Sequence, residues 1–269
     1  MTALSKIDTI KALTRTAVTA YANGFQARHL SEVSDPQGTI NMKIHNVFIS
    51  VLGPEIQYYT ALVRSLDSSL GNMLEALAIE IAKLSFVVKR NVEGPLSNEQ
   101  TQIIATLLEQ YKSHQKIPNV LDYQSLRIKP KNTDLPFKRH DSDYYLINQE
   151  DNSHFLIELK IGGDLDNKKA RSEKEAILEQ FAILSNTLPE STSIKIYFAT
   201  GYNRYGEGQP WEQQRVKQFF ASEELLIGSN FWNFVSQLNN GYDIVLEEYC
   251  NNASLIKDAL ANIKSAYLP

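Results

Sequence analysis

The chain has a single cysteine, Cys250, among its 269 residues. One thiol excludes a disulfide framework and a zinc site built from several cysteines, and it favours a cytoplasmic location. Long uncharged apolar runs are also absent, so we expect no transmembrane helix and no membrane partner. The N-terminus lacks an apolar stretch followed by small residues, and secretion is therefore not expected. The five histidines show no paired spacing such as His-Glu-x-x-His, which disfavours a histidine metal site.

An excess of basic charge is missing too, because 27 Lys and Arg face 31 Asp and Glu, for a net charge of −4. This balance argues against a passive, nonspecific nucleic-acid coat, but it leaves a DNA enzyme open because metal-binding carboxylates add negative charge. The basic residues still gather on both sides of residues 143–160. They are Arg127, Lys129, Lys131, Lys138 and Arg139 before it, and Lys168, Lys169, Arg171 and Lys174 after it. Such flanking charge fits a phosphate-binding groove, or equally an ordinary solvated surface.

The hydrophobic pattern predicts an α/β protein. Helices are expected over residues 4–22, 67–90, 97–111, 172–184, 215–238 and 252–267. Residues 194–200 are typical of a buried strand because they are rich in β-branched and aromatic side chains. A long connection is expected over 114–140 and a polar loop over 201–214. We expect one domain over 1–269, with a helical part over about 1–115, a catalytic core over about 136–215 and C-terminal helices over about 215–269.

The most informative stretch is residues 143–160, where two apolar runs flank a polar Asp-Asn-Ser break and predict a β-hairpin. Residues two apart in a strand share a face, so Glu158 and Lys160 should point the same way. The hairpin can also bring Asp143 beside them. Two carboxylates and a lysine on one face can hold a divalent metal and a water next to a phosphate. The alternative is a surface hairpin whose charges are solvated.

Phosphodiester hydrolysis needs a nucleophilic water, charge neutralisation at phosphorus and help for the leaving oxygen, and a hard cation supplies most of this. Mg²⁺ prefers oxygen ligands, and one or two carboxylates plus a substrate phosphate suffice. Asp143 and Glu158 suit that role, and the backbone carbonyl of Leu159 can add an oxygen. Lys160 would orient or activate the water. Asp141 is the rival first carboxylate, because it lies two residues before Asp143.

The Asp143…Glu158-Leu-Lys160 arrangement resembles the PD-(D/E)XK nuclease core, although Ser142 stands where that motif has proline. Residues 64–75, 198–206 and 228–234 are similar to stretches of the TdeIII-like type II restriction endonucleases. The resemblance covers residues 60–245. It implies a mixed β-sheet flanked by helices, with additional N- and C-terminal helices. It also implies Mg²⁺-dependent hydrolysis of double-stranded DNA at a short palindromic site, GGNCC-like in relatives.

The resemblance further implies a homodimer, since a two-fold symmetric site calls for a two-fold symmetric reader, and a cognate DNA methyltransferase as functional partner. It assigns catalysis to Asp143, Glu158 and Lys160, and a second metal position to Glu75, for which a solvated helix face is the alternative. Arg64, Lys168, Lys169 and Arg171 are expected to contact phosphates. The loop after residues 194–200 is expected to read bases, through Tyr202, Asn203, Arg204, Gln213 and Arg215, or to be a polar surface turn.

Three residues have alternatives of their own. Gln180 either reaches the active site or makes a partly buried hydrogen bond. Trp211 and Trp232 are expected to be packing anchors, with base-stacking platforms as the alternative. Two other functions also remain open. One is a DNA-repair or junction-resolving nuclease with the same core, and the other is a catalytically dead DNA-binding or interaction module.

Overall fold

A computed structural model describes residues 3–127, 136–163 and 165–268, and it divides the chain into two compact units. Unit 1 comprises Met1–Glu80 and Asp243–Pro269, and unit 2 comprises Ile81–Tyr242. The expectation of a single domain stays a prediction. No helix among the described residues combines the length and the apolar character that a membrane span requires.

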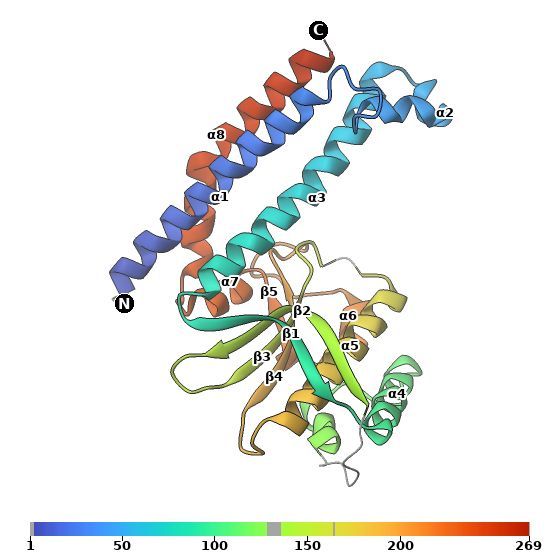
Figure 1. Ribbon diagram of the computed structural model, residues 1–269, viewed down its shortest axis with the longest axis vertical. Helices are drawn as coiled ribbons and strands as arrows, with labels where there is room; N and C mark the ends of the chain where they lie inside the picture. The colour runs from blue at the N-terminus through green and yellow to red at the C-terminus, as the bar shows by residue number, and fades with distance from the viewer. Residues whose placement is uncertain (1–2, 128–135, 164, 269) are drawn as a thin grey trace. The chain divides into compact units, whose positions relative to one another are not determined.

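Unit 1 is built from three long helices, α1 (Ala3–Ser31), α3 (Pro54–Ala82) and α8 (Gly241–Tyr267). Figure 1 shows α1 and α8 side by side, with α3 running beside them. Two apolar clusters join the three helices, one around Phe25, Tyr58 and Ile263 and the other around Val18, Met73 and Ile256. Between α1 and α3 the chain forms two short helices, η1 (Asn41–His45) and α2 (Val47–Ser50).

Unit 2 contains a five-stranded sheet in the order β1-β2-β3-β4-β5. The strands are β1 (Phe86–Pro95), β2 (Phe137–Asn148), β3 (His154–Leu159), β4 (Ile194–Thr200) and β5 (Leu225–Ile227). Pairing is antiparallel from β1 to β3 and parallel from β3 to β5. A mixed sheet flanked by helices confirms the expected α/β, restriction-endonuclease-like fold.

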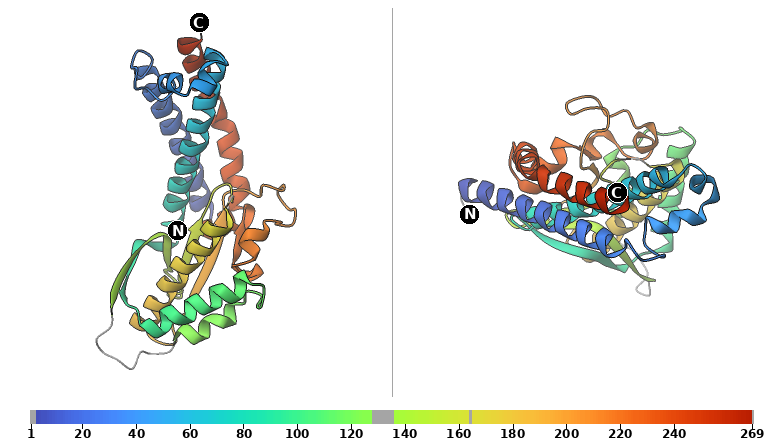
Figure 2. Two further views of the ribbon diagram at one scale, coloured as in Figure 1. Left: turned by 90° about the vertical axis from the view of Figure 1, so that its right-hand side faces the viewer. Right: turned by 90° about the horizontal axis from the view of Figure 1, so that it is seen from above.

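The long helix α5 (Asn167–Thr187) covers one face of this sheet and connects β3 to β4, as a parallel crossover requires. Its buried side chains join those of β3 and β4 in the main core, and α4 (Asn98–Lys112) packs on its outer side (Figure 2). The opposite face carries α7 (Ser229–Ser236), whose Phe234 ring stacks on Phe86 and meets Phe155 edge-on. The remaining short helices are η2 (Val120–Arg127), α6 (Gln214–Lys217) and η3 (Ser222–Glu224).

Several expected elements are confirmed. Residues 143–160 form the β2–β3 hairpin, with Tyr144 opposite Ile157, and residues 194–200 form β4. The expected helix over 97–111 is α4, which begins after a capping box made by Ser97 and Gln100. Both tryptophans are packing anchors, since Trp211 and Trp232 are buried and the Trp232 indole donates to the carbonyl of Gly201.

Two expectations were wrong. The helix expected over 67–90 begins earlier, at Pro54, and ends at Ala82, because Phe86 starts β1. Phe86 and its two valines pair with the end of β2, and that tertiary pairing overrides the apparent helical period. The helix expected over 215–238 is interrupted by β5, which pairs its three residues with the end of β4. Part of the expected 114–140 connection, residues 128–135, lies outside the described residues.

Candidate functional site

Glu158 and Lys160 lie on the α5 face of the sheet, at the carboxyl end of β3. Leu156, two residues before Glu158, belongs to the core beneath α5, so Glu158 continues the same face. The Lys160 ammonium forms an ion pair with the Glu158 carboxylate, which confirms that the two side chains point to one side. Both remain within reach of solvent, with 12% of the Glu158 side chain and 33% of the Lys160 side chain exposed.

The backbone around Lys160 is fixed to β4. The amide of Lys160 donates to the carbonyl of Ala199 at 3.0 Å, and the amide of Gly201 donates to the carbonyl of Ile161 at 3.1 Å. The chain then turns at Gly163, whose φ of 63° lies in the left-handed region that glycine tolerates best. These bonds place the start of the 201–214 loop directly beside the lysine.

A third charged group, Glu173, reaches the same place from α5. Its carboxylate oxygen lies 3.5 Å from the Lys160 Nζ, and 27% of its side chain is exposed. The sequence reasoning missed this residue, although a signal was present. Glu173 lies four residues before Ile177 and eleven before Leu184, on the stripe that turns toward the sheet. An acid on such a stripe is unusual enough to mark a candidate.

The expected first carboxylate lies in β2. Asp143 falls within that strand, but its side chain lies outside the described residues. Asp141 is exposed, and it lies opposite Asn91 of β1, next to a shift in the β1–β2 register. A bulge of this kind re-aims the side chains around it. Two residues that precede Asp141 in β2, Lys138 and His140, both contact α5.

Lys138 and His140 meet the carboxylate of Glu179, which is nearly buried. Lys138 Nζ lies 2.9 Å from one oxygen and His140 Nε2 lies 2.9 Å from the other. Contact with His140, followed by that with Lys138, lowers the pKa of Glu179 against the opposing effect of burial. The positive charge of Lys138, expected in a phosphate-binding flank, is therefore balanced inside the protein.

The other basic candidates differ in exposure. Lys168 and Lys169 are exposed at the start of α5, which Asp166 caps through the Lys169 amide. Arg171 is half-buried and lies 3.6 Å from Glu109 of α4. Two residues, Lys129 and Lys131, lie outside the described residues. The exposed pair on α5 remains available for a phosphate, because a surface contact costs them little desolvation.

The loop over 201–214 presents some of its polar side chains and uses others to hold its shape. Among the expected base contacts in and just after this loop, the exposed ones are Tyr202, Arg204 and Arg215. Asn203 is buried, donating to the carbonyl of Gln209 and accepting from the amide of Tyr205. Gln213 is also buried, and it accepts a hydrogen bond from the Arg215 amide at the start of α6.

Tyr202 lies next to the turn that follows β3. Its hydroxyl is close to Gly162, at 3.1 Å from the position that a β-carbon on that glycine would take. The loop therefore begins beside the expected catalytic residues.

Arg64 and Glu75 lie on α3 in unit 1, where Arg64 is exposed and Glu75 half-buried, and their expected roles stay predictions. Gln180 of α5 is buried, and its Oε1 has no hydrogen-bond partner among the described residues.

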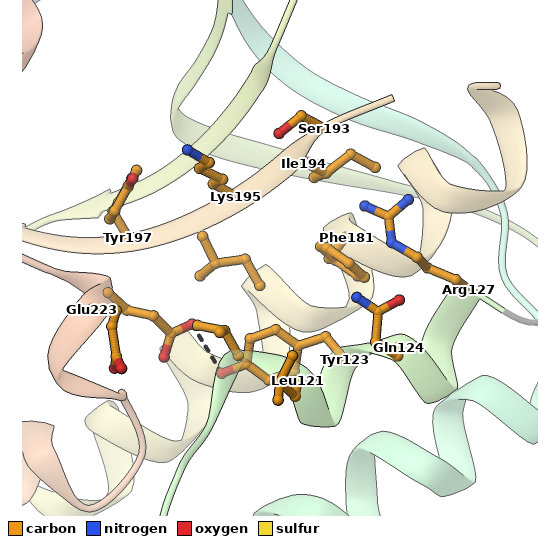
Figure 3. A pocket seen from close by; sticks show the side chains of 13 residues that line it. Leu121, Tyr123, Gln124, Arg127, Phe181, Ser193, Ile194, Lys195, Tyr197 and Glu223 are labelled. Atoms are coloured by element: carbon orange, nitrogen blue, oxygen red, sulfur yellow. Dashed lines mark hydrogen bonds between the residues drawn. The ribbon is translucent and has the colours of Figure 1, made fainter. Parts of the chain in front are cut away.

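A cavity of about 370 Å³ lies at the other end of β4 (Figure 3). Lys195 and Tyr197 border it from the strand, and Tyr123, Gln124 and Arg127 border it from η2. The Arg127 guanidinium already donates to the carbonyls of Glu190 and Thr192. The cavity touches neither Glu158 nor Lys160, whose strand pairs with the opposite end of β4.

Among the residues whose placement the structure describes, no three His, Cys, Asp or Glu side chains gather as a metal-binding group. Two carboxylates, those of Glu158 and Glu173, do contact the Lys160 ammonium. Carboxylate oxygens are hard ligands, so this donor set suits Mg²⁺ better than a soft metal.

A family model described as "Type II restriction endonuclease, HinfI" matches residues 23–253, which is most of the chain. No curated protein and no solved structure matches. The match supports the expected class of enzyme, but it does not reach the finer resemblance to the TdeIII-like enzymes.

Proposed function

The chain belongs to the HinfI family of type II restriction endonucleases, and on that premise we propose that it hydrolyses double-stranded DNA at a short palindromic site with Mg²⁺ as cofactor. The observation that carries the proposal is the ion-paired group of Glu158, Lys160 and Glu173 at the end of β3. Family membership indicates the class of reaction, and this group of charged side chains indicates where in the fold we propose that the reaction takes place.

Three oxygen donors are assigned to the metal, the carboxylates of Asp143 and Glu158 and the backbone carbonyl of Leu159. We add Glu173 as a further carboxylate, because it shares Lys160 with Glu158. When bound, Mg²⁺ would withdraw charge from the phosphate and lower the pKa of a bound water. Glu75 stays a proposed ligand for a second position, since it lies in a stretch that resembles related nucleases.

Asp143 is preferred over Asp141 as the first carboxylate. Lys138 and His140 contact Glu179 of α5, so their side chains turn toward the face that carries Glu158. Asp141 follows His140 directly and is exposed. Because side chains alternate along a strand, Asp141 is expected on the other face. Asp143 comes two residues before Tyr145, which belongs to the core beneath α5, so beyond the register shift it is expected on the α5 face.

We assign Lys160 the role of positioning and activating the attacking water. Its ammonium donates hydrogen bonds to an attacking oxygen, and its positive charge stabilises the charge that develops on the phosphoryl oxygens. The water oxygen forms the new bond to phosphorus, and its proton passes to solvent or to a neighbouring carboxylate. The bond to the leaving oxygen breaks, and that oxygen takes up a proton from solvent. The hydrogen bond from the Lys160 amide to Ala199 fixes the backbone from which this side chain extends.

Sequence recognition is assigned to the loop over 201–214, which starts beside the catalytic strand. The proposed base contacts are the exposed candidates Tyr202, Arg204 and Arg215, and an arginine can bond guanine bidentately. Asn203 and Gln213 are proposed to hold the loop while reaching toward DNA, and Arg64, Lys168, Lys169 and Arg171 to contact phosphates. A GGNCC-like site, as in the TdeIII-like enzymes, remains the expected target.

A homodimer is proposed, because each strand of a palindrome needs its own active site. A cognate methyltransferase is the proposed functional partner, since the host's own copies of the site need protection, and no stable complex between the two is expected. The cytoplasm is the proposed location.

Plasmid digestion tests the proposal. Purified protein with Mg²⁺ should give discrete fragments, and sequencing their ends should give the site and the cleavage position. Lys160→Ala should lower the cleavage rate by about 10²–10⁴-fold while leaving duplex binding largely intact. Lys195→Ala is the matched control, because this lysine of β4 lies over the Phe155 ring on the opposite face. Normal cutting by Lys160→Ala would show that the active site lies elsewhere.

The two alternative functions predict other products. A repair or junction-resolving nuclease would nick branched substrates and leave a linear duplex intact. A catalytically dead module would bind DNA but would cut neither branched DNA nor linear duplex, whether Mg²⁺ or Mn²⁺ is supplied. Discrete fragments from an unbranched plasmid would exclude both.

A further inference from the structure

η1, α2 and the first turns of α3 lie at one end of unit 1 (Figure 1). Their exposed side chains form an unusually apolar surface. Exposed fractions of its large hydrophobic side chains run from 37% for Tyr59 to 84% for Phe48. We call it the tip surface, and its nine members are Met42, Ile44, Val47, Phe48, Val51, Leu52, Ile56, Tyr59 and Val63.

The members on α3 form a stripe separate from the core stripe of that helix. Ile56, Tyr59 and Val63 follow the i, i+3, i+7 spacing of a single helix face. Tyr58 and Leu62 are buried against the other helices of the unit. The first turns of α3 are therefore apolar on two sides. One side packs in the core of unit 1, and the other is exposed.

The tip surface is also nearly free of charge. Between Ile40 and Val63 the only Lys, Arg, Asp or Glu residues are Lys43 and Glu55, whereas 22% of the whole chain is charged. A surface that meets DNA carries Lys and Arg for the phosphates. The partner of this surface is therefore apolar.

Its size matches a protein interface. At an order of 100 Å² for each exposed side chain, the nine members present roughly 900 Å². The largest apolar patch of an ordinary monomer is about 300–600 Å². A stable protein–protein interface takes about 800 Å² from each partner.

Internal hydrogen bonds hold the surface in shape. The side-chain amide of Gln57 donates to the carbonyl of Ser50 at 3.2 Å and links α2 to α3. Ile40, at the start of η1, is buried in the same cluster as Tyr58. Little ordering is needed on association, which favours a stable complex.

We infer that the tip surface is the interface through which two copies of this chain form a symmetric dimer. A second copy presents the same apolar area, and an isologous contact matches that surface with itself. The expectation of two-fold symmetry rests on the proposed function, because a palindromic site presents two equivalent strands. The area and the lack of charge are independent of that function.

Sedimentation of the full-length protein tests the inference. Wild-type protein should have twice the 30.5 kDa mass of the chain at micromolar concentration. Phe48→Glu and Val51→Glu should each raise the dissociation constant of the dimer by at least about 100-fold, because a charge must be desolvated at the centre of the contact. Ile117→Glu is the matched control, since Ile117 is 86% exposed and belongs to unit 2. Circular dichroism should show the same helix content in all four proteins.

Three results would overturn the inference. They are a wild type that remains a monomer with and without DNA, a dimer that Phe48→Glu and Val51→Glu leave intact, and a monomer that floats with lipid vesicles. Plasmid cleavage separates this failure from that of the proposed function. A dimer that the glutamate variants dissociate, but that cuts no plasmid, would support the interface and refute the nuclease. An enzyme that cuts plasmid, and whose sedimentation mass the glutamate variants leave unchanged, would support the nuclease and refute the interface.

Discussion

Replacing Lys174 with methionine should destabilise unit 2 strongly. The Lys174 ammonium lies 2.8 and 2.9 Å from the two carboxylate oxygens of Glu224, and both side chains are almost fully buried. Burial lowers the pKa of Lys174, and the charge of Glu224 opposes that effect. The ammonium also lies over the Tyr123 and Phe220 rings, at 4.7 and 4.3 Å from their centroids. Few solvent contacts are left to either charge.

The size of the destabilisation depends on which interactions the Glu224 carboxylate retains in the variant. In Lys174→Met its carboxylate still accepts from the Tyr123 hydroxyl and from the Ala221 amide, but it has no counter-charge. Removing one partner of a buried ion pair costs about 3–5 kcal/mol. For a domain of this size that corresponds to a fall of about 10 °C in the melting temperature. The double variant Lys174→Met/Glu224→Gln should recover most of the loss, because no buried charge remains.

Differential scanning calorimetry checks this prediction. The control is Lys112→Met, because Lys112 lies 3.4 Å from Glu109 with 55% of its side chain exposed. Exposed pairs of this kind contribute little, so its melting temperature should stay within about 2 °C of wild type. If Lys174→Met melts as late as the control, or if the double variant melts no later than the single one, the pair is not desolvated as described.

Other predictions concern the carboxylates of α5 and the recognition loop. Glu173→Gln should slow cleavage at least about 10-fold at saturating DNA, whereas the exposed neighbour Glu175→Gln should not; equal rates would remove Glu173 from the site. The lowered pKa of Glu179 stabilises the fold above its ordinary value of 4.5, and that stability is lost as pH falls through the folded pKa. Urea unfolding of Glu179→Gln should therefore depend less on pH below about 5 than wild type. Arg204→Ala should weaken specific binding by about 1–3 kcal/mol and leave nonspecific binding nearly unchanged, as competition binding will show.

The hairpin and β4 were predictable because each satisfies a local rule. Polar turn residues separate two apolar runs in the first case, and β-branched and aromatic residues fill a short run in the second. The fold class followed from their order. β1 was not predictable in the same way, since Val87 and Val88 follow a helical stripe without a breaker and become a strand only by pairing with β2. β5 has three residues, too few to show any period.

The residues of the candidate site also fall into those that local sequence rules predict and those that only tertiary contacts bring into place. Glu158 and Lys160 were predictable because strand alternation alone sets their common face. Glu173 lies thirteen residues further on, and only the packing of α5 against the sheet brings it back to Lys160. Its position depends on tertiary contacts, which no local pattern contains. The same is true of the pair formed by Lys138 with Glu179, which removes one cation from the expected phosphate groove.

The charge arrangement at Lys160 gives this lysine two roles that substitution can separate. One positive charge lies between the carboxylates of Glu158 and Glu173, so it relieves the repulsion between two like charges. Arginine keeps that charge but carries a planar, more weakly hydrated group that cannot be deprotonated. Lys160→Arg should therefore retain the melting temperature and the metal affinity of wild type while losing most of the cleavage rate. Lys160→Ala should lower the melting temperature as well as the cleavage rate, because the two carboxylates then face each other without a cation between them. If arginine restores full activity, positive charge alone is sufficient, and the proposed role of Lys160 in positioning the water is wrong.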